Sequence, residues 1–406
     1  MAYLDLDLNL TEEQLMFRDT VHKFANEAMR PISERLDLLS PEEVIAPNSE
    51  FWDYMKGAYK LGLHKILIPE EYGGLGLAPV EVNMVAEEMG WGACDLTIAL
   101  GVCCFPAFLS AMVPTDFLTD NIILPFCNDE EGKYTGCWAI TEPDHGSDTL
   151  ACKTVQFQEP ATSGKVRARK EKDYWVLNGQ KSAWVSMGTV ASHAAVYLTI
   201  DPDMGMAGGG ICIVPLDLPG VTRGKPLDKM GKRALNQGEL YFDNVKVREE
   251  YMLIEEDSYE AILDVTLATA NAYMSAVYTG VARAAYEEAL AYAKERVQGG
   301  KVLFEHQTVR YKLFHMFKSI EASRALSRAA MNYNMNNTPP ATEYSVAAKI
   351  FCTDTAFQVA HEAIQIFGGN GLAREYHIEK IFRDARAGLI EDGSNDSLAV
   401  FASERL

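Results

Sequence analysis

The sequence predicts an α+β protein in which a helical region, a small β region and a helical bundle follow one another. The first observation is a change of pattern. Apolar residues recur at helical spacing up to about residue 135, follow strand-like patterns over 136–250, and return to helical spacing over 251–406. The second is length, because 406 residues exceed what one hydrophobic core usually serves. We therefore expect three domains, at residues 1–135, 136–250 and 251–406.

The N-terminal region begins with a helix-start signal. Thr11 and Gln14 have the spacing of a capping box, and apolar residues at helical spacing follow over 17–28. A glycine-rich segment at 70–76 predicts a turn between two helices, the second of which covers 80–89. This region is therefore expected to be α-helical.

The middle region carries strand and turn signals. Asn178-Gly179, flanked by two short apolar runs, predicts the turn of a β-hairpin. Residues 211–214 follow three glycines and have the composition of a buried strand. Asp243-Asn244 predicts the end of a strand before two more apolar positions. Together these signals indicate a small β domain.

The C-terminal region is almost free of helix breakers. Its main interruptions are Gly299-Gly300 and Pro339-Pro340, which divide the remainder into long segments of helical pattern. Three or four long helices fit, and they are expected to form an antiparallel bundle.

Composition and charge exclude several functions. A formal net charge of −20 argues against nucleic acid and anionic membranes as partners. No stretch approaches the ~20 apolar residues of a membrane span, and the acid-rich start lacks the basic region of a secretory signal. We therefore expect a cytoplasmic protein without membrane insertion. The eight cysteines form no CxxC pair and no metal-ligand cluster, so reduced core cysteines are expected and no metal site.

The most specific motif runs from Trp138 to Asp148. A strand followed by a turn with glycine and serine can present backbone N–H groups and hydroxyls to a ligand. Within it, residues 141–148 resemble the T-E-P-x-x-G-S-D signature of the FAD-dependent acyl-CoA dehydrogenase family. Five further segments resemble that family in the right order, at 178–186, 229–245, 295–307, 365–371 and 383–385. This resemblance covers about residues 60 to 400 and implies the family's fold of helical, β and helical-bundle domains.

The resemblance also implies a homotetramer with one FAD per subunit. The flavin ring and ribityl chain would lie against Trp138, Ile140, Thr141, Gly146, Ser147, Trp184, Val185 and Ser186. Arg296 and the turn formed by Gln365, Ile366, Gly368 and Gly369 would reach FAD across a subunit interface. An arginine suits the pyrophosphate, and a glycine turn permits close backbone approach. Further cofactor contacts are expected from Gln298, His306, Gln307, Ser394 and Asp396.

The catalytic base of the family is a carboxylate in a Y-E-G-T segment, which removes the α-proton as hydride leaves Cβ for flavin N5. Here that segment is Glu391-Asp392-Gly393-Ser394, which places Asp392 at the base position. Aspartate and glutamate both have pKa values near ~4 when exposed, but aspartate is shorter by about 1.5 Å. The backbone N–H of Asp392 would polarise the thioester carbonyl. Glu391 remains an alternative base, because a shift of one residue would exchange the two acids.

Four positions bear on the substrate. Ser147 and Gly393 match residues beside the thioester and pantetheine, and Asn271 stands where straight-chain members often carry an arginine. Asp95 falls near the position where glutaryl-CoA dehydrogenases place an arginine, which argues against a simple dicarboxylyl substrate. Relatives acting on cyclohexene-carboxyl-CoA have a second catalytic carboxylate in a similar place. The other interpretation of Asp95 is a helix N-cap.

The resulting expectation is an acyl-CoA dehydrogenase that passes electrons to electron-transfer flavoprotein. Its substrate would be a cyclic or aryl acyl-CoA, such as cyclohexane-carboxyl-, cyclohexene-carboxyl- or benzylsuccinyl-CoA. Two alternatives stay open: a flavin-dependent monooxygenase or oxidase on the same fold, and a non-catalytic acyl-CoA-binding protein. Which of Asp392, Glu391 and Asp95 acts as the base also stays open.

Overall fold

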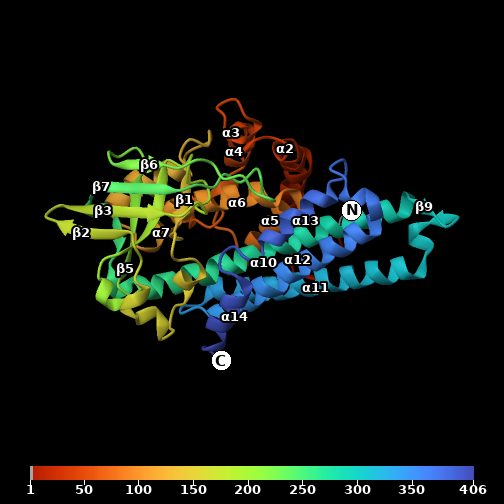
Figure 1. Cartoon of the computed structure of the whole chain (residues 1–406). Coiled ribbons are helices and arrows are strands. Elements are labelled where there is room, and N and C mark those ends of the chain that lie inside the picture. The colour runs from red at the N-terminus through yellow and green to blue at the C-terminus, as the bar shows by residue number, and fades with distance from the viewer. Residues whose placement is uncertain (1–2) are drawn as a thin grey trace.

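The computed structural model describes residues 3–406 and has the predicted order of helices, sheet and bundle (Figure 1). The helices of the first part are α1 (Glu12–Phe24), α2 (Arg30–Leu36), α3 (Pro41–Val44), α4 (Glu50–Lys60), α5 (Pro79–Gly92), α6 (Cys94–Cys103), α7 (Phe105–Met112), α8 (Asp116–Leu118) and α9 (Leu124–Cys127). The capping box is confirmed: the Thr11 hydroxyl accepts from Gln14 N–H, and Thr11 N–H donates to the Gln14 side chain. The predicted turn at 70–76 and the helix after it are also present.

The middle region is an eight-stranded sheet. Its strands are β1 (Gly136–Ala139), β2 (Arg167–Glu171), β3 (Tyr174–Lys181), β4 (His193–Thr199), β5 (Gly209–Pro215), β6 (Val221–Arg223), β7 (Leu240–Arg248) and β8 (Met252–Ile254). Their order is β6-β7-β3-β2-β4-β5-β8, and β1 pairs with β4 in parallel. The predicted buried strand at 211–214 lies within β5.

Two turn predictions in this region are wrong. Asn178-Gly179 lies inside β3, and the β2–β3 hairpin turns instead at Lys172, whose φ is 51°. Asn244, also with φ 51°, lies inside β7. The two irregular sites face each other, because Asn244 N–H donates to Asn178 Oδ1 at 2.9 Å where the β3–β7 register shifts. The side-chain hydrogen bond thus replaces a ladder bond at a β-bulge, so the turn-forming residues bend two strands without ending them.

The C-terminal part is a bundle of three long helices with two short ones. These are α10 (Glu256–Glu295), α11 (Gln307–Asn336), α12 (Thr342–Phe367), α13 (Ile378–Ala387) and α14 (Asn395–Ser403), with the small hairpin β9 (Val297–Gln298) and β10 (Lys301–Val302) between α10 and α11. The predicted breakers lie in the two connections between the long helices. In Figure 1, α10 runs from the sheet to the far end of the bundle, where β9 lies.

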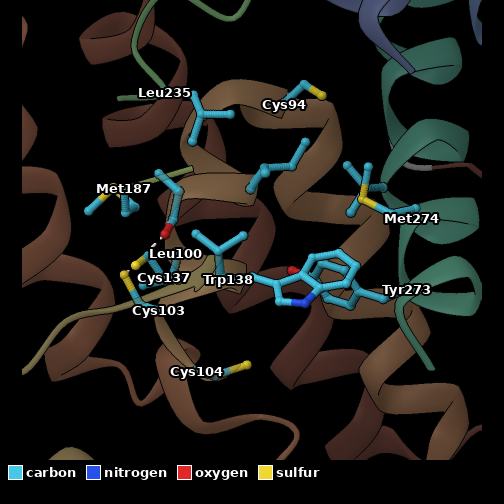
Figure 2. Packing of buried hydrophobic residues seen from close by; sticks show 14 of the residues in the cluster. Cys94, Leu100, Cys103, Cys104, Cys137, Trp138, Met187, Leu235, Tyr273 and Met274 are labelled. Carbon is cyan, nitrogen blue, oxygen red and sulfur yellow. Dashed lines mark hydrogen bonds between the residues drawn. The ribbon is translucent and has the colours of Figure 1, made fainter. Parts of the chain in front are cut away.

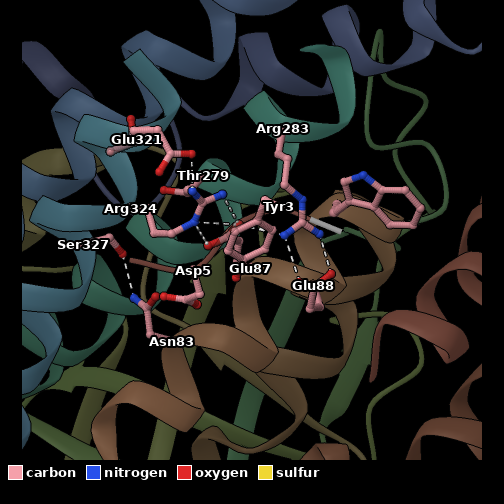
Figure 3. A network of polar contacts seen from close by, with 12 residues as sticks. Tyr3, Asp5, Asn83, Glu87, Glu88, Thr279, Arg283, Glu321, Arg324 and Ser327 are labelled. Carbon is pink, nitrogen blue, oxygen red and sulfur yellow. Dashed lines mark hydrogen bonds and ion pairs between the residues drawn. The ribbon is translucent and has the colours of Figure 1, made fainter. Parts of the chain in front are cut away.

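The N-terminal helices pack directly on the bundle. α5 meets α10 so closely at Gly90 and Gly280 that a Cβ on either residue would overlap backbone atoms of the other helix. Beside this contact lies a buried polar cluster, shown in Figure 3. Glu87 pairs with Arg283 at 2.8 Å and with Arg324 at 2.9 Å, and the Tyr3 ring lies over the Arg324 guanidinium at 3.9 Å. The first and last regions of the chain therefore share one core.

The expected state of the cysteines is confirmed, since all eight are buried and free. Within residues 3–406, no group of three or more His, Cys, Asp or Glu side chains could hold a metal ion. In the same part of the chain, no single helix is long and apolar enough to cross a membrane, although the bent pair α6–α7 meets the length and composition criteria.

Candidate active site

A cavity lies where α6, α7 and α10 meet the 3₁₀ turn at Leu63–Lys65 and the turn after α13. Its lining residues surround about 650 Å³ of space, part of which is open to solvent, and most of the lining is apolar, including the rings of Phe105, Phe108 and Tyr273. Figure 2 shows buried residues of α6, β1 and α10 gathered around this junction. Burial lowers the pKa of His64, another lining residue, to about 4, so this ring is neutral. Among residues 3–406, no lysine or arginine lines the cavity, and Asp392 is the one carboxylate that does.

Asp392 lies in a tight turn between α13 and α14. Its φ is 52° and that of Gly393 is 93°, so both residues have left-handed backbone conformations; aspartate tolerates this region better than most residues. No described residue accepts a hydrogen bond from the Asp392 N–H. The next N–H, that of Ser394, donates to Ser147 Oγ at 2.9 Å. The turn therefore joins the predicted base to the 138–148 motif and leaves one N–H free for a ligand.

The environment of Asp392 suits a proton acceptor. Burial, followed by the charge of the neighbouring Glu391, raises the pKa of Asp392 to about 7. A general base works best when its pKa lies near the working pH. Asp392 therefore combines position, backbone geometry and pKa in the manner expected of a base.

Glu391, the alternative base, is held away from the cavity lining. Its Oε1 atom accepts hydrogen bonds from both the Lys232 ammonium and the Tyr278 hydroxyl. Glu391 itself does not line the cavity. Of the two adjacent acids, the one that lines the cavity is Asp392.

Asp95 has a different place from the one predicted. It is fully buried, pairs with Lys380 Nζ at 2.9 Å and accepts from Ser33 Oγ at 2.8 Å. It does not line the cavity, so the structure does not support a second carboxylate facing the acyl group. It is not the N-cap of α6 either, because Ala93 occupies that position. Although burial opposes ionisation, the Lys380 ammonium lowers the pKa of Asp95, and the residue is a buried counter-charge.

The first group of predicted cofactor residues comes together beside the turn that carries Asp392. Ser182 N–H donates to Thr141 O at 2.9 Å, which ties the 138–148 segment to the 182–186 segment. Ile140 and Val185 are buried beneath, whereas the Trp184 side chain is 58% exposed. The buried Trp138 Nε1 has no hydrogen-bond partner among the described residues, and a Cβ on Gly146 would meet nothing within 4 Å. An exposed indole and an open glycine turn fit the ring and ribityl chain of FAD.

The second group of predicted cofactor residues lies at the far end of the bundle. Arg296 and Gln298 follow α10, and His306 Nε2 approaches Gln298 O at 2.9 Å. The Gly368 turn lies beside them, because Phe367 stacks on Tyr292 with ring centroids 4.1 Å apart. Exposed members of this group are Arg296, Gln298, Gln307, Gln365, Gly368 and Gly369, while Ile366 is buried. At 1.5 Å per helical residue, Arg296 is about 33 Å along α10 from the cavity residue Met274.

The remaining predicted residues have mixed positions. Asn271 is buried and donates to Leu267 O at 3.0 Å, without lining the cavity. Asp396 is exposed in the first turn of α14, and Ser394 is the N-cap of that helix. Their predicted contacts stay predictions.

Sequence reasoning missed three residues around Asp392 and Glu391: Lys232, Tyr278 and Lys349. Lys349 is fully buried, and its ammonium donates to Gly393 O at 2.7 Å and to Asn395 Oδ1 at 2.8 Å. It therefore fixes the turn that carries Asp392. The available signal was a single lysine among the small and apolar residues of 345–352, a position that helical spacing places on a buried face.

Comparisons with known proteins agree with this geometry. Three family models match in order: the acyl-CoA dehydrogenase N-terminal domain at residues 11–112, the middle domain at 137–245 and the C-terminal domain at 262–406.

Two curated relatives and one solved structure are similar along nearly their whole lengths. Short-chain specific acyl-CoA dehydrogenase of Rattus norvegicus is 32% identical over 96% of this chain and 89% of its own. Cyclohex-1-ene-1-carbonyl-CoA dehydrogenase of Geobacter metallireducens is 31% identical over 95% of this chain and 96% of its own. The structure of butyryl-CoA dehydrogenase from Megasphaera elsdenii superimposes with a TM-score of 0.86 at 29% identity, covering 98% of this chain and 99% of that one. With its fold, its motif order and these matches, the chain belongs to the acyl-CoA dehydrogenase family, whose members are flavoprotein oxidoreductases acting on acyl-CoA.

Proposed function

We propose that this protein is an FAD-dependent acyl-CoA dehydrogenase in which Asp392 removes the α-proton of the acyl group. The observation that carries the proposal is the position of Asp392 at a largely apolar cavity, on a turn bonded to the 138–148 motif. Its raised pKa, about 7, matches the role.

The chain's own residues account for the proton transfer. The thioester carbonyl binds at the free Asp392 N–H, which withdraws electron density and acidifies the α C–H bond. The Asp392 carboxylate takes the α-proton as the Cα–Cβ double bond forms. When bound, FAD would supply the acceptor for the hydride that leaves Cβ. The apolar walls exclude water, and Lys349 keeps the base turn in place through Gly393 O.

The cofactor proposal requires more than one subunit. Residues 138–147 and 184–186 would hold the flavin ring and ribityl chain, and Arg296 with the Gly368 turn would hold the rest. Because these groups lie far apart in one chain, a second copy would supply the latter, as in a homotetramer. The exposed apolar side chains of Tyr311, Phe314 and Phe317 on α11 offer a surface for such contacts.

The first prediction concerns cofactor and assembly. The purified protein should be yellow, contain FAD and have the mass of a tetramer, as measured by its absorption spectrum and by light scattering. Anaerobic addition of a suitable acyl-CoA should bleach the flavin, and electron-transfer flavoprotein should restore the colour. Rapid reoxidation by O₂ instead would favour the oxidase or monooxygenase. A colourless protein that cannot take up FAD would contradict the proposal and favour a non-catalytic acyl-CoA-binding protein.

We further propose a cyclic or aryl acyl-CoA as the substrate. The aromatic rings of Phe105, Phe108 and Tyr273 suit a bulky ring, and the short Asp392 side chain leaves space for one. The absence of a lining lysine or arginine in the described chain disfavours a free distal carboxylate. The reaction named for the Geobacter metallireducens relative is of this kind. With Asp95 buried against Lys380, this proposal no longer depends on a second acid.

The second prediction compares substrates. Cyclohexanecarboxyl- or cyclohexene-carboxyl-CoA should exceed octanoyl-CoA in kcat/KM by at least tenfold, equivalent to ~1.4 kcal/mol of transition-state binding. A ring would hold its α-carbon against Asp392, whereas a straight chain lacks a matching wall. Steady-state rates with both substrates measure this, with benzylsuccinyl-CoA as a larger aryl probe. A tenfold preference for octanoyl-CoA would rule out the ring proposal and leave the base assignment intact.

A further inference from the structure

An ion pair beside the base has no counterpart in the family motif. The family has tyrosine where this chain has Glu391, and Glu391 is bound to Lys232 and Tyr278. The Lys232 side chain is 3% exposed and Tyr278 is fully buried. A carboxylate with a buried ammonium and a buried phenol on one oxygen is fixed in position.

The partners of Glu391 come from separate parts of the fold. Lys232 lies in the loop between β6 and β7, and its backbone N–H is bound by the Asp384 carboxylate of α13. Tyr278 lies in α10, and a Cβ on Gly388, just after α13, would overlap its ring. Sheet, bundle and base turn are therefore joined at the Glu391 carboxylate, one residue from Asp392.

We propose that Glu391 is a positioning residue: its carboxylate, held by Lys232 and Tyr278 one residue from Asp392, offsets the cations around the base and so supports its acceptance of the α-proton. This inference rests on the proposed function and adds a residue to its machinery. Aspartate is a weak base when exposed, with a pKa near ~4. A second carboxylate next to it opposes its ionisation and so strengthens it as a base.

The other charges near Asp392 act in the opposite direction. Lys349 of α12 and Lys232 both lower the pKa of Asp392, whereas burial and Glu391 raise it. Burial lowers the pKa of Lys349 to about 8, so this cation is still largely charged at pH 7. Among the neighbours of Lys232, burial raises the pKa of the Cys94 thiol to about 12 and leaves it neutral, and Asp384 is paired with Lys380 at 2.6 Å. Glu391 is thus the anion that offsets two cations at the base.

The sign of the effect follows from these charges. Without the Glu391 charge, Lys232 and Lys349 would face Asp392 unopposed, and the pKa of Asp392 would fall. The base would then be ionised at lower pH but would bind a proton less tightly. The acid limb of the rate profile should move to lower pH, and the plateau rate should decline.

The third prediction tests this with Glu391→Gln. For the wild type, kcat/KM should rise about tenfold per pH unit below pH 7 and level off above it, following the Asp392 pKa of about 7. In Glu391→Gln the limb should lie about one pH unit lower or more, the size of shift that a nearby charge produces. Adding Lys232→Met to Glu391→Gln should move the limb back upward, because it removes one of the two cations. FAD absorbance and tetramer mass report whether each variant is folded.

The outcomes separate this inference from the base assignment. If Asp392→Asn is inactive and the acid limb of Glu391→Gln stays at the wild-type pH or moves to higher pH, the proposed role of Glu391 is wrong. The assignment of Asp392 as the base would stand. Full activity in Asp392→Asn would instead overturn the proposed function. Should Glu391→Gln lose FAD, the double variant still decides, since it removes both members of the buried pair together. Its limb should lie below that of the wild type, because Glu391 acts on Asp392 more strongly than Lys232 does.

Discussion

Replacing Asp392 by Asn should lower the rate of flavin bleaching by ~10²-fold or more, the usual effect of losing a positioned general base. Asparagine is nearly isosteric with aspartate and also tolerates a positive φ, so it suits the value of 52° at this position. The free N–H at residue 392 would remain, so the substrate should still bind. Stopped-flow bleaching under anaerobic conditions measures the rate, and the FAD spectrum reports the folded state.

The matched control for this prediction is Glu391→Gln, which removes the neighbouring acid that does not line the cavity. Its plateau rate should fall far less than that of Asp392→Asn, and its acid limb should lie at lower pH. A fully active Asp392→Asn protein would move the base elsewhere, and Glu391 would be the next residue to test. An equal loss of activity in both variants would contradict the assignment of the base to Asp392 alone.

Lys380→Met should be the most destabilising of the substitutions considered, by about 3–5 kcal/mol, the typical cost of removing one partner from a buried ion pair. Lys380 is the ammonium between Asp95, at 2.9 Å, and Asp384, at 2.6 Å, and all three side chains are buried. Burial raises the pKa of Asp384 and the Lys380 ammonium lowers it, so the variant would remove the charge that favours ionisation of this carboxylate. Thermal unfolding followed by FAD release measures the loss.

A second variant separates stability from catalysis at this site. Asp95→Asn should lower the unfolding temperature while flavin bleaching by a good substrate proceeds at nearly the wild-type rate, because Asp95 does not line the cavity. Combining Asp95→Asn with Lys380→Met should recover part of the lost stability, because a neutral amide then replaces one of the two carboxylates that lost their cation. A large loss of bleaching rate in folded Asp95→Asn would restore the catalytic interpretation of Asp95.

The fold was accessible from the sequence where local chemistry and long-range packing agree. Thr11 and Gln14 form the capping box that their spacing predicts, and the paired breakers at 299–300 and 339–340 separate the long helices. The hairpin turn predicted at Asn178-Gly179 was wrong, because this pair forms an irregular site inside β3, opposite Asn244. That outcome depends on the neighbouring strand, which no local pattern reveals.

The site was predicted in part for the same reason. Asp392 and the 138–147 segment could be singled out as candidates because both carry recognisable motifs, and the hydrogen bond from Ser394 to Ser147 joins the two segments. The role of Asp95 could not be foreseen, because its partner Lys380 is 285 residues away in the sequence. Lys232 and Lys349 were missed because a buried lysine looks like a surface lysine until its partners are known.

The polar cluster beneath Tyr3 has a consequence for synthesis of the chain on the ribosome. Glu87 emerges 196 residues before Arg283 and 237 residues before Arg324, its two partners. At ~5–20 residues per second, roughly 10 to 50 s pass before the two arginine partners have been synthesised. During that interval the α5 surface that will contact α10 is uncovered and carries negative charge. The N-terminal helices can therefore complete their packing only after the C-terminal bundle has been synthesised, when translation is nearly finished.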